Sequence, residues 1–224
     1  SANVVDICPV GALTNKEFRF RSRVWYLDHT PSVCPTCATG CNIDIHHRGD
    51  QIFRFRPRYN EAVNGYWMCD EGRLSWRRYQ GEGRLLKPVL RTDGGWKESH
   101  WNDALDGAAT RLRQIAAQGG AGSIGGIVSA RATTEEAFLF ARLIRDTLKG
   151  RVAGFGWSPP DALHDDFLID ADKNPNAAGL RAIGLDPTAA EALLHDGAGG
   201  SLKALVLLRA DFSESHGREV IEKL

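Results

Sequence analysis

The sequence has little of what would direct it to a membrane or to a polyanion. No apolar run approaches the roughly 20 residues that a helix needs to cross a bilayer. Neither sign of charge is in excess, since 28 Lys and Arg face 28 Asp and Glu, and this balance argues against nucleic acid as a partner. With 42% hydrophobic residues in 224 positions, the composition is typical of a globular protein large enough to bury a core.

Cysteine is also missing from most of the chain. All five cysteines stand at positions 8, 34, 37, 41 and 69, and none follows as far as Leu224. An odd number of closely spaced cysteines is a poor disulfide framework and a good metal framework. The clustering therefore indicates ligation rather than scattered core thiols.

The spacing of the cysteines indicates which metal group they hold. Cys34, Cys37 and Cys41 form a C-x2-C-x3-C array, and Cys69 follows after 27 intervening residues. Structural zinc sites usually pair two C-x2-C knuckles around one ion, whereas three close thiolates and a remote one suit the four corners of a cubane. We therefore predict a [4Fe-4S] cluster with Cys34, Cys37, Cys41 and Cys69 as ligands. Zinc is the alternative.

Cys8 stands apart in Asp6-Ile7-Cys8-Pro9-Val10-Gly11-Ala12-Leu13. A Cys-Pro pair commonly ends a ferredoxin-like ligand set, but nothing before it could complete such a set. From the residues alone, Cys8 is either a buried apolar thiol or a ligand whose partners lie outside this sequence.

The first third of the chain has the patterns of a small β-rich region. Aromatic and aliphatic residues alternate with arginine over residues 17–27, which predicts a strand. Two further strands at residues 42–46 and 51–56, joined by a turn at Gly49, predict an antiparallel hairpin behind the cysteine loop. A short helix is expected after Cys69, and residues 87–95 are interpreted as a linker.

The pattern changes after the linker. Residues 102–117 have helical periodicity, residues 124–128 form a short apolar strand, and Thr133 or Thr134 can cap the next helix. Residues 189–194 are again helical in type, and residues 202–208 are a continuous apolar strand. Alternating helices and buried strands predict an α/β layer with a largely parallel sheet.

The predicted domains are the end of a cluster region with a connecting strand at 1–28, a cluster domain at 29–90 and an α/β domain at 91–224.

Residues 16–91 carry a net charge of +6, which places cations near the cysteines. Positive charge close to a cluster raises its reduction potential. The candidates for this tuning are Arg54, Arg56, Arg58, Arg73, Arg77 and Arg78.

His46 and His47, beside the ligand loop, are interpreted as structural because four thiolates already complete the site. Four tryptophans are interpreted as core or interface anchors, namely Trp25, Trp67, Trp76 and Trp101.

Together these segments resemble a known family. Five stretches are similar to parts of the large iron-sulfur subunit of NADH-quinone oxidoreductase. They are Asp6-Ile7-Cys8-Pro9-Val10-Gly11-Ala12-Leu13-Thr14, the four-cysteine array, Trp101-Asn102-Asp103-Ala104-Leu105, Ser129-Ala130-Arg131-Ala132-Thr133-Thr134-Glu135-Glu136 and Asp170-Ala171-Asp172-Lys173-Asn174-Pro175-Asn176. This component of respiratory complex I, called the G subunit or the 75 kDa subunit, is part of the molybdopterin oxidoreductase superfamily.

The resemblance has consequences for the fold and for Cys8. It implies a small [4Fe-4S]-binding β-rich domain followed by a molybdopterin-oxidoreductase-like α/β domain that is incomplete here. It also implies that Cys8 is the last ligand of a second [4Fe-4S] cluster, whose other ligands lie outside the chain. We accordingly expect the chain to be an internal piece of a longer protein.

Two departures from the catalytic members of the superfamily indicate the branch. Those enzymes usually have Lys soon after the fourth cluster cysteine, whereas Cys69 is followed by Asp70-Glu71-Gly72-Arg73. No thiol that could bind molybdenum follows Gly150, although Ser158 or Asp161 stays open as such a ligand. The resemblance thus implies no pterin or molybdenum, and the alternative is a molybdopterin-dependent oxidoreductase such as an NAD-linked formate dehydrogenase.

The function implied is an electron relay within NADH:quinone oxidoreductase, with little or no catalysis by the isolated chain. The glycines at 122–126 do not form a G-x-G-x-x-G fingerprint, so NADH oxidation is expected on a partner flavoprotein subunit. Other iron-sulfur subunits of the complex are the further partners. Thiolate iron sites persist best in reducing compartments, which indicates the cytoplasm. The resemblance implies the cytoplasmic side of the inner membrane, with membrane contact only through the complex.

Overall fold

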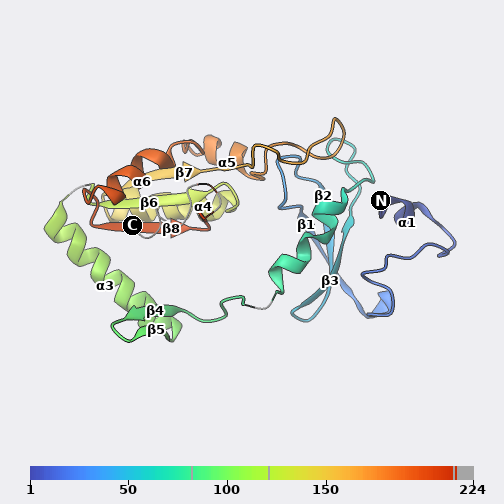
Figure 1. The fold of residues 1–224 in the computed structure, drawn as a ribbon, viewed down its shortest axis with the longest axis horizontal. Coiled ribbons are helices and arrows are strands. Elements are labelled where there is room, and N and C mark those ends of the chain that lie inside the picture. Colours follow the sequence, from blue (N-terminus) through green and yellow to red (C-terminus); the bar gives the residue numbers. More distant parts are fainter. Residues whose placement is uncertain (82, 121, 214, 216–224) are drawn as a thin grey trace. The chain divides into compact units, whose positions relative to one another are not determined.

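The computed structural model describes residues 1–81, 83–120, 122–213 and 215. The chain divides into two compact units (Figure 1), and each is discontinuous in sequence. The first unit combines Ser1–Arg84 with Ser158–Pro175, and the second combines Leu85–Trp157 with Asn176–Leu224. Sequence analysis had placed residues 158–175 within the α/β region, whereas their contacts group them with the cysteines. Within the described residues, no helix combines the length and hydropathy needed to cross a membrane.

The first unit is built on a three-stranded antiparallel sheet. Its strands are β1 (Asp28–Val33), β2 (Asn42–Arg48) and β3 (Gln51–Pro57), in the order β1-β2-β3. The predicted hairpin is confirmed as β2 and β3, and Gly49 at its turn has φ of +56°, a left-handed conformation that glycine adopts without strain. Val33 at the end of β1 faces Asn42 at the start of β2, so the loop of residues 34–41 closes one end of the sheet.

Short helices complete this unit. They are α1 (Asn3–Ile7), the 3-10 turn η1 (Val24–Tyr26), α2 (Asp70–Leu74) and the 3-10 helix η2 (Ser75–Tyr79). The helix expected after Cys69 is therefore present. The core joins Cys34 and Cys41 to four side chains from the sheet and helices, namely Ile43, Phe55, Met68 and Trp76.

The strand predicted for residues 17–27 is wrong. This segment consists of turns followed by η1, and the sheet begins instead at Asp28. An isolated strand leaves its backbone groups unpaired, and β1 pairs with β2 rather than with this segment. Its aromatic residues have other surroundings: the Arg54 guanidinium lies 4.0 Å from the centroid of the Phe18 ring, and Phe20 is 95% exposed.

The predicted linker overlaps a small hairpin. Strands β4 (Val89–Thr92) and β5 (Gly95–Glu98) pair antiparallel at the start of the second unit. The turn signal at residues 93–95 was correct, but two strands of four residues each are too short to show an alternating pattern.

The second unit is an α/β layer, as predicted. Its parallel sheet has the order β7-β6-β8, with β6 (Ile124–Ser129) between β7 (Arg151–Phe155) and β8 (Ala204–Leu208). All six residues of β6 are buried, which explains its continuous apolar character. The helices are α3 (Trp101–Gly119), α4 (Thr134–Ala141) with a π-helical continuation (Arg142–Thr147), α5 (Ala177–Ala182) and α6 (Ala190–Ala198).

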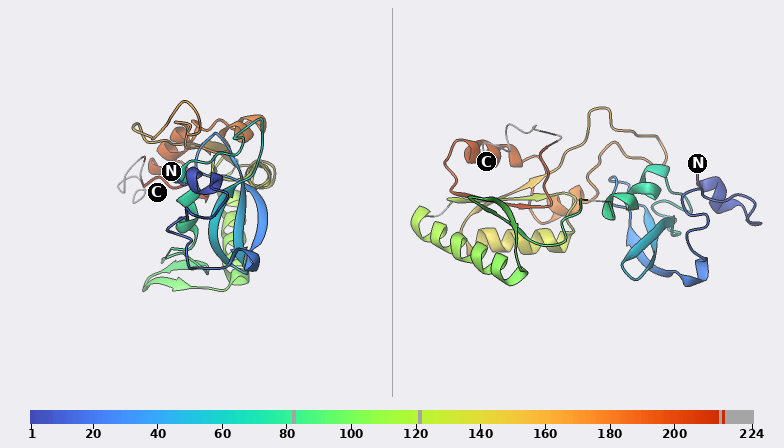
Figure 2. Two further views of the ribbon diagram at one scale, coloured as in Figure 1. Left: turned by 90° about the vertical axis from the view of Figure 1, so that its right-hand side faces the viewer. Right: turned by 60° about the horizontal axis from the view of Figure 1, so that its bottom comes forward.

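Two hydrophobic clusters lie on the opposite faces of this sheet. Helix α4 packs with α5 against Ile124 and Val128, and α6 packs against Ile127 on the other side (Figure 2). Helix α3 has no fully buried residue, although Leu112 and Ile115 pack against the first cluster.

The start of α4 resolves an open choice between two caps. Thr133 is the N-cap: its hydroxyl accepts from Glu136 N at 3.2 Å, and the Glu136 carboxylate accepts from Thr133 N at 2.9 Å. This reciprocal pair is a capping box.

Candidate functional site

The four clustered cysteines come together in the first unit. Cys34, Cys37 and Cys41 lie on the loop between β1 and β2, and Cys69 is the N-cap of α2. All four are buried and none forms a disulfide. Burial raises the pKa of the Cys41 thiol to about 12, and the neighbouring thiols of Cys34, Cys37 and Cys69 contribute to the same shift. The remote Cys69 lies beside the cysteine loop, since Cys34 Sγ and Cys69 Sγ are both within 3.4 Å of a Cβ built on Gly72.

Gly72 provides the backbone approach that a bulky inorganic group requires. A Cβ at this position would lie 2.8 Å from Cys34 Sγ and 3.4 Å from Cys69 Sγ. The Gly72 N–H donates to Cys69 Sγ at 3.3 Å, and amide dipoles aimed at sulfur stabilise the negative charge of a cluster. Only glycine leaves the space between these two sulfurs free.

The cysteine loop has the features expected of a cluster-binding loop. Cys34 N donates to Cys41 O at 2.8 Å and closes the loop, and Gly40 has φ of +63°. The Thr36 hydroxyl lies 3.4 Å from Cys34 Sγ, and the Thr39 hydroxyl lies 3.4 Å from Cys37 Sγ.

The chemistry of the donors fits an iron-sulfur group. Burial raises the pKa of the Cys34 and Cys69 thiols, and a positively charged metal core would favour their thiolate forms. Among the described residues, no three or more His, Cys, Asp or Glu side chains are arranged around a single metal ion. The fit to a [4Fe-4S] cluster therefore rests on four buried sulfurs and on the close approach of Gly72.

A distant segment covers the cysteine loop. Ala38 N donates to Asp172 O at 2.8 Å, and the Thr39 hydroxyl donates to Leu168 O at 3.0 Å. Residues 158–175, which follow β7, are thus hydrogen-bonded to the loop through Leu168 and Asp172. These hydrogen bonds are the reason that the segment belongs to the first unit. Sequence reasoning missed this contact, since its one signal there was the family resemblance of residues 170–176.

Asn64 is a second residue that the sequence analysis missed. It is 4% exposed, accepts from Asn42 N at 2.9 Å and donates to Trp67 O at 2.9 Å. It thereby ties the start of β2, directly after the cysteine loop, to the segment that leads to Cys69. The Asn64-Gly65 turn dipeptide was the available signal.

Cys8 lies on a separate part of the first unit and is only partly buried, which is not the environment of a core thiol. Hydrogen bonds from the backbone N–H groups of Leu13 and Val10 lower the pKa of this thiol. The preceding helix α1 is attached through Asn3, whose side-chain oxygen accepts from Met68 N at 3.2 Å and from Arg73 at 2.9 Å. A role for Cys8 in a second cluster stays a prediction.

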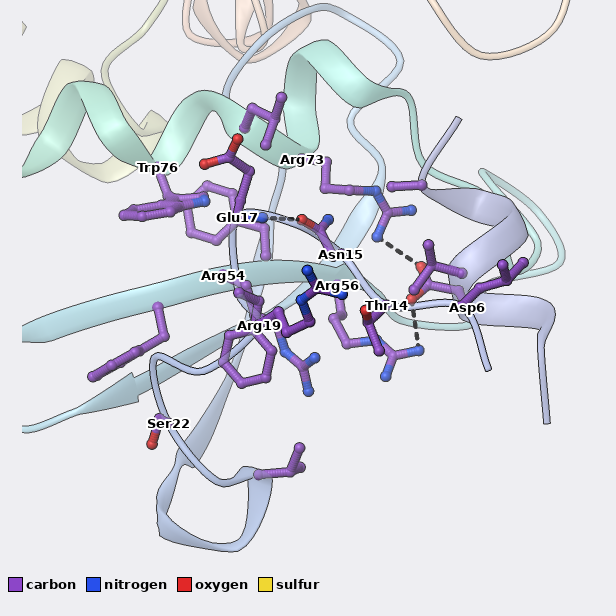
Figure 3. A pocket seen from close by; sticks show the side chains of 18 of the residues that line it. Asp6, Thr14, Asn15, Glu17, Arg19, Ser22, Arg54, Arg56, Arg73 and Trp76 are labelled. Atoms are coloured by element: carbon purple, nitrogen blue, oxygen red, sulfur yellow. Dashed lines mark hydrogen bonds and ion pairs between the residues drawn. The ribbon is translucent and has the colours of Figure 1, made fainter. Parts of the chain in front are cut away.

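Several candidate arginines line a cavity of about 340 Å³ between the N-terminal segment and β3 (Figure 3). Asp6 bonds two of them, Arg73 at 2.6 Å and Arg56 at 2.8 Å. Burial and the neighbouring Arg56 lower the pKa of Arg54 to about 10. The cations therefore gather around one shared carboxylate, and their effect on a cluster potential stays a prediction.

The remaining candidates lie outside this group. Arg58 donates to Asn42 Oδ1 at 2.9 Å, Arg77 is paired with Glu17, and Arg78 is exposed.

Comparisons with known proteins place these two units. The model of the molybdopterin oxidoreductase Fe4S4 domain matches residues 27–81 and so encloses all four clustered cysteines. The molybdopterin oxidoreductase model matches residues 84–155, which include β6 and α4. The chain belongs to the family of the NADH-quinone oxidoreductase G subunit. It contains an Fe4S4 domain, as the cysteine spacing predicted.

Named relatives show how much of such proteins the chain spans. The G subunit of the NADH-quinone oxidoreductase of Rickettsia bellii is 31% identical over 97% of this chain and 32% of its own length. Subunit 3 of the Thermus thermophilus NADH-quinone oxidoreductase is 32% identical over 87% of this chain and 24% of its own length. The alpha subunit of an NADPH-Fe(3+) oxidoreductase from Geobacter sulfurreducens is 38% identical over 65% of this chain and 17% of its own length. The chain thus spans a third or less of these relatives.

His46 and His47 of this family member occupy structural surroundings, and the tryptophans differ in their exposure. His46 is buried, stacks on His29 with ring centroids 3.9 Å apart and accepts from Arg54 Nε at 3.1 Å. His47 forms hydrogen bonds with Thr30 and with Gly49 O. Trp76 is in the core, whereas Trp25 and Trp101 are exposed and Trp67 is partly so.

The two residues that sequence analysis left open as molybdenum ligands differ in their surroundings. Ser158 Oγ accepts from Lys173 N at 2.8 Å and from Asn174 Nδ2 at 3.1 Å. Asp161 is exposed. The absence of molybdenum from this member of the NADH-quinone oxidoreductase family stays a prediction.

Proposed function

We propose that the chain is part of an iron-sulfur subunit that relays electrons in an NADH:quinone oxidoreductase, with Cys34, Cys37, Cys41 and Cys69 as ligands of one [4Fe-4S] cluster. The observation that carries the proposal is the set of four buried cysteines within the matched Fe4S4 domain. A bound cluster of this kind supplies reversible electron transfer without making or breaking substrate bonds. The isolated chain is expected to perform little or no catalysis.

The residues of the first unit have distinct parts in this role. The four thiols bind the cluster and release their protons on binding. The Gly72 amide is oriented toward sulfur, and the cysteine loop is closed at its base and covered by residues 158–175. Burial excludes water from the sulfurs, which both protects a cluster and sets its potential.

The rest of the complex supplies the other steps. NADH is oxidised on a partner flavoprotein subunit, further iron-sulfur subunits continue the relay toward quinone, and Cys8 belongs to a second cluster completed by residues outside this chain. The protein lies on the cytoplasmic side of the membrane and meets it only through the complex.

The Geobacter relative favours a second function of the same type. Its name gives NADPH and iron(III) rather than NADH and quinone. Both functions use a relay subunit, and they differ in the electron donor and acceptor of the complex. Turnover of the purified complex with each nicotinamide, with quinone and iron(III) as acceptors, separates the two.

The decisive experiment is elemental analysis of the complex purified without oxygen. We expect iron and inorganic sulfide with no molybdenum or tungsten. Cys37→Ser should lose four iron atoms per chain, whereas Cys8→Ser should leave the iron of the Cys34–Cys69 site in place. Stoichiometric zinc, or molybdenum or tungsten with a released pterin, would contradict the proposal.

A further inference from the structure

Lys173 is an unusual residue in the segment that covers the cysteine loop. Its side chain is 8% exposed, and its ammonium donates to Leu163 O at 2.6 Å and to the Glu71 carboxylate at 3.2 Å. Lysine is almost never buried to this extent unless it is paired, because desolvation of the charge costs several kcal/mol. Its burial therefore depends on the partner carboxylate.

That carboxylate lies beside the proposed cluster ligands. Glu71 stands in α2 between Cys69 and Gly72, and a Cβ on Gly72 would lie 2.8 Å from Cys34 Sγ and 3.4 Å from Cys69 Sγ. Without a counter-charge, such a carboxylate would disfavour the reduced cluster, which carries one more negative charge than the oxidised one. Lys173 is the counter-charge that the structure provides.

The position of Lys173 is fixed independently of Glu71. The same segment is attached to the cysteine loop by the hydrogen bonds from Ala38 and Thr39. Its own backbone N–H donates to Ser158 Oγ at 2.8 Å, which closes the base of the segment. The ammonium is thus held at a defined place and is not the end of a free surface chain.

We propose that Lys173 is a positioning and charge-compensating residue for the iron-sulfur site, and that through Glu71 it sets the reduction potential of the cluster. This inference rests on the proposed function, since it requires a cluster at the four cysteines. It assigns to residues 158–175 a role in electron transfer in addition to covering the loop.

The test is a charge cycle in the full chain, prepared anaerobically within its complex. Lys173→Met, Glu71→Gln and the double variant are compared by redox titration of the cluster, followed by electron paramagnetic resonance. Lys173→Met should lower the midpoint potential because it leaves the carboxylate uncompensated. Glu71→Gln should raise it because it leaves the ammonium, and the double variant should return toward the parent value. Lys173→Arg keeps the charge and should restore most of the potential.

Control measurements separate this role from a structural one. The Lys87–Glu98 pair is also an ion pair, at 2.8 Å, but both side chains are about two-thirds exposed and belong to the other unit, so Lys87→Met should leave the potential unchanged. A purely structural Lys173 would loosen residues 158–175 toward protease without producing shifts of opposite sign. If Lys173→Met does not retain iron, the isosteric Glu71→Gln variant still tests the direction.

The outcomes are distinct. A parent chain without iron overturns both the proposed function and this inference. A parent chain with a normal cluster, and single variants whose potentials are unchanged or shift in the same direction, overturns the inference alone.

Discussion

The ion pair between Asp6 and Arg73 allows the attachment of the N-terminal segment to be tested quantitatively. The Arg73 side chain is 5% exposed, and its Nη1 lies 2.6 Å from Asp6 Oδ2. In Asp6→Asn the shape of the side chain is kept and its charge is lost. Arg73 then retains the neutral oxygen of Asn3 at 2.9 Å and the Asp70 carboxylate at 3.8 Å.

Removing one partner of a buried ion pair costs about 3–5 kcal/mol. Because Asp70 still compensates part of the charge, we expect the lower end, about 3 kcal/mol of unfolding free energy. The assay is urea unfolding under anaerobic conditions, followed by tryptophan fluorescence and checked by refolding. With typical urea dependences, the midpoint should fall by roughly 1–3 M.

Arg56 provides the matched control. Its guanidinium bonds the same carboxylate at 2.8 Å, but its side chain is 36% exposed. Surface pairs contribute less than about 1 kcal/mol, so Arg56→Gln should change the midpoint little. An Asp6→Asn loss below about 1 kcal/mol, or an equal loss in the two variants, would refute the reasoning from burial.

Three further predictions follow from single contacts. Gly72→Ala should expel most of the cluster iron because its methyl group would meet Cys34 Sγ. A Cβ added at Gly107 would meet no neighbouring group within 4 Å, so Gly107→Ala should keep the iron and stabilise α3 by up to about 1 kcal/mol. Equal iron contents would contradict this. Burial lowers the pKa of His46 to about 3. Below about pH 6.5, His46 therefore binds a proton in the unfolded chain but stays neutral in the folded chain. Stability should fall with decreasing pH by at most about 1.4 kcal/mol per pH unit from this group, and His46→Gln should show a smaller slope between about pH 6 and 4; an unchanged slope would count against it. Thr133→Ala removes the capping box and should cost roughly 0.5–2 kcal/mol, measured by thermal unfolding, with no loss of iron.

The sequence was informative where local spacing decides structure. Cysteine spacing predicted the Fe4S4 domain that the family model matches, and apolar runs predicted β6 and β8. The run of β6 is explained by its complete burial in the centre of a parallel sheet. The strand predicted at residues 17–27 failed because a strand also needs a partner, and alternation alone does not supply one.

Apart from the short hairpin of β4 and β5, the features that the sequence did not predict are contacts between distant residues. The salt bridge of Lys173 to Glu71 joins positions about a hundred residues apart, and the hydrogen bond from Asn42 N to Asn64 joins the start of β2 to a turn. Each of these residues is of a type that is common in ordinary loops. Their burial depends on the tertiary fold, so no periodicity or spacing in the sequence could indicate it.

The discontinuity of the first unit has a consequence for synthesis. The four cysteines emerge from the ribosome before the segment that covers them, since Leu85–Trp157 must be translated in between. At about 5–20 residues per second, the cysteine loop then waits roughly 5–20 s before Leu168 and Asp172 can reach it. During this interval the thiols are open to iron-sulfur donors and also to oxidants and zinc. The order of the chain thus leaves a period for cofactor insertion and ends it when the covering segment arrives.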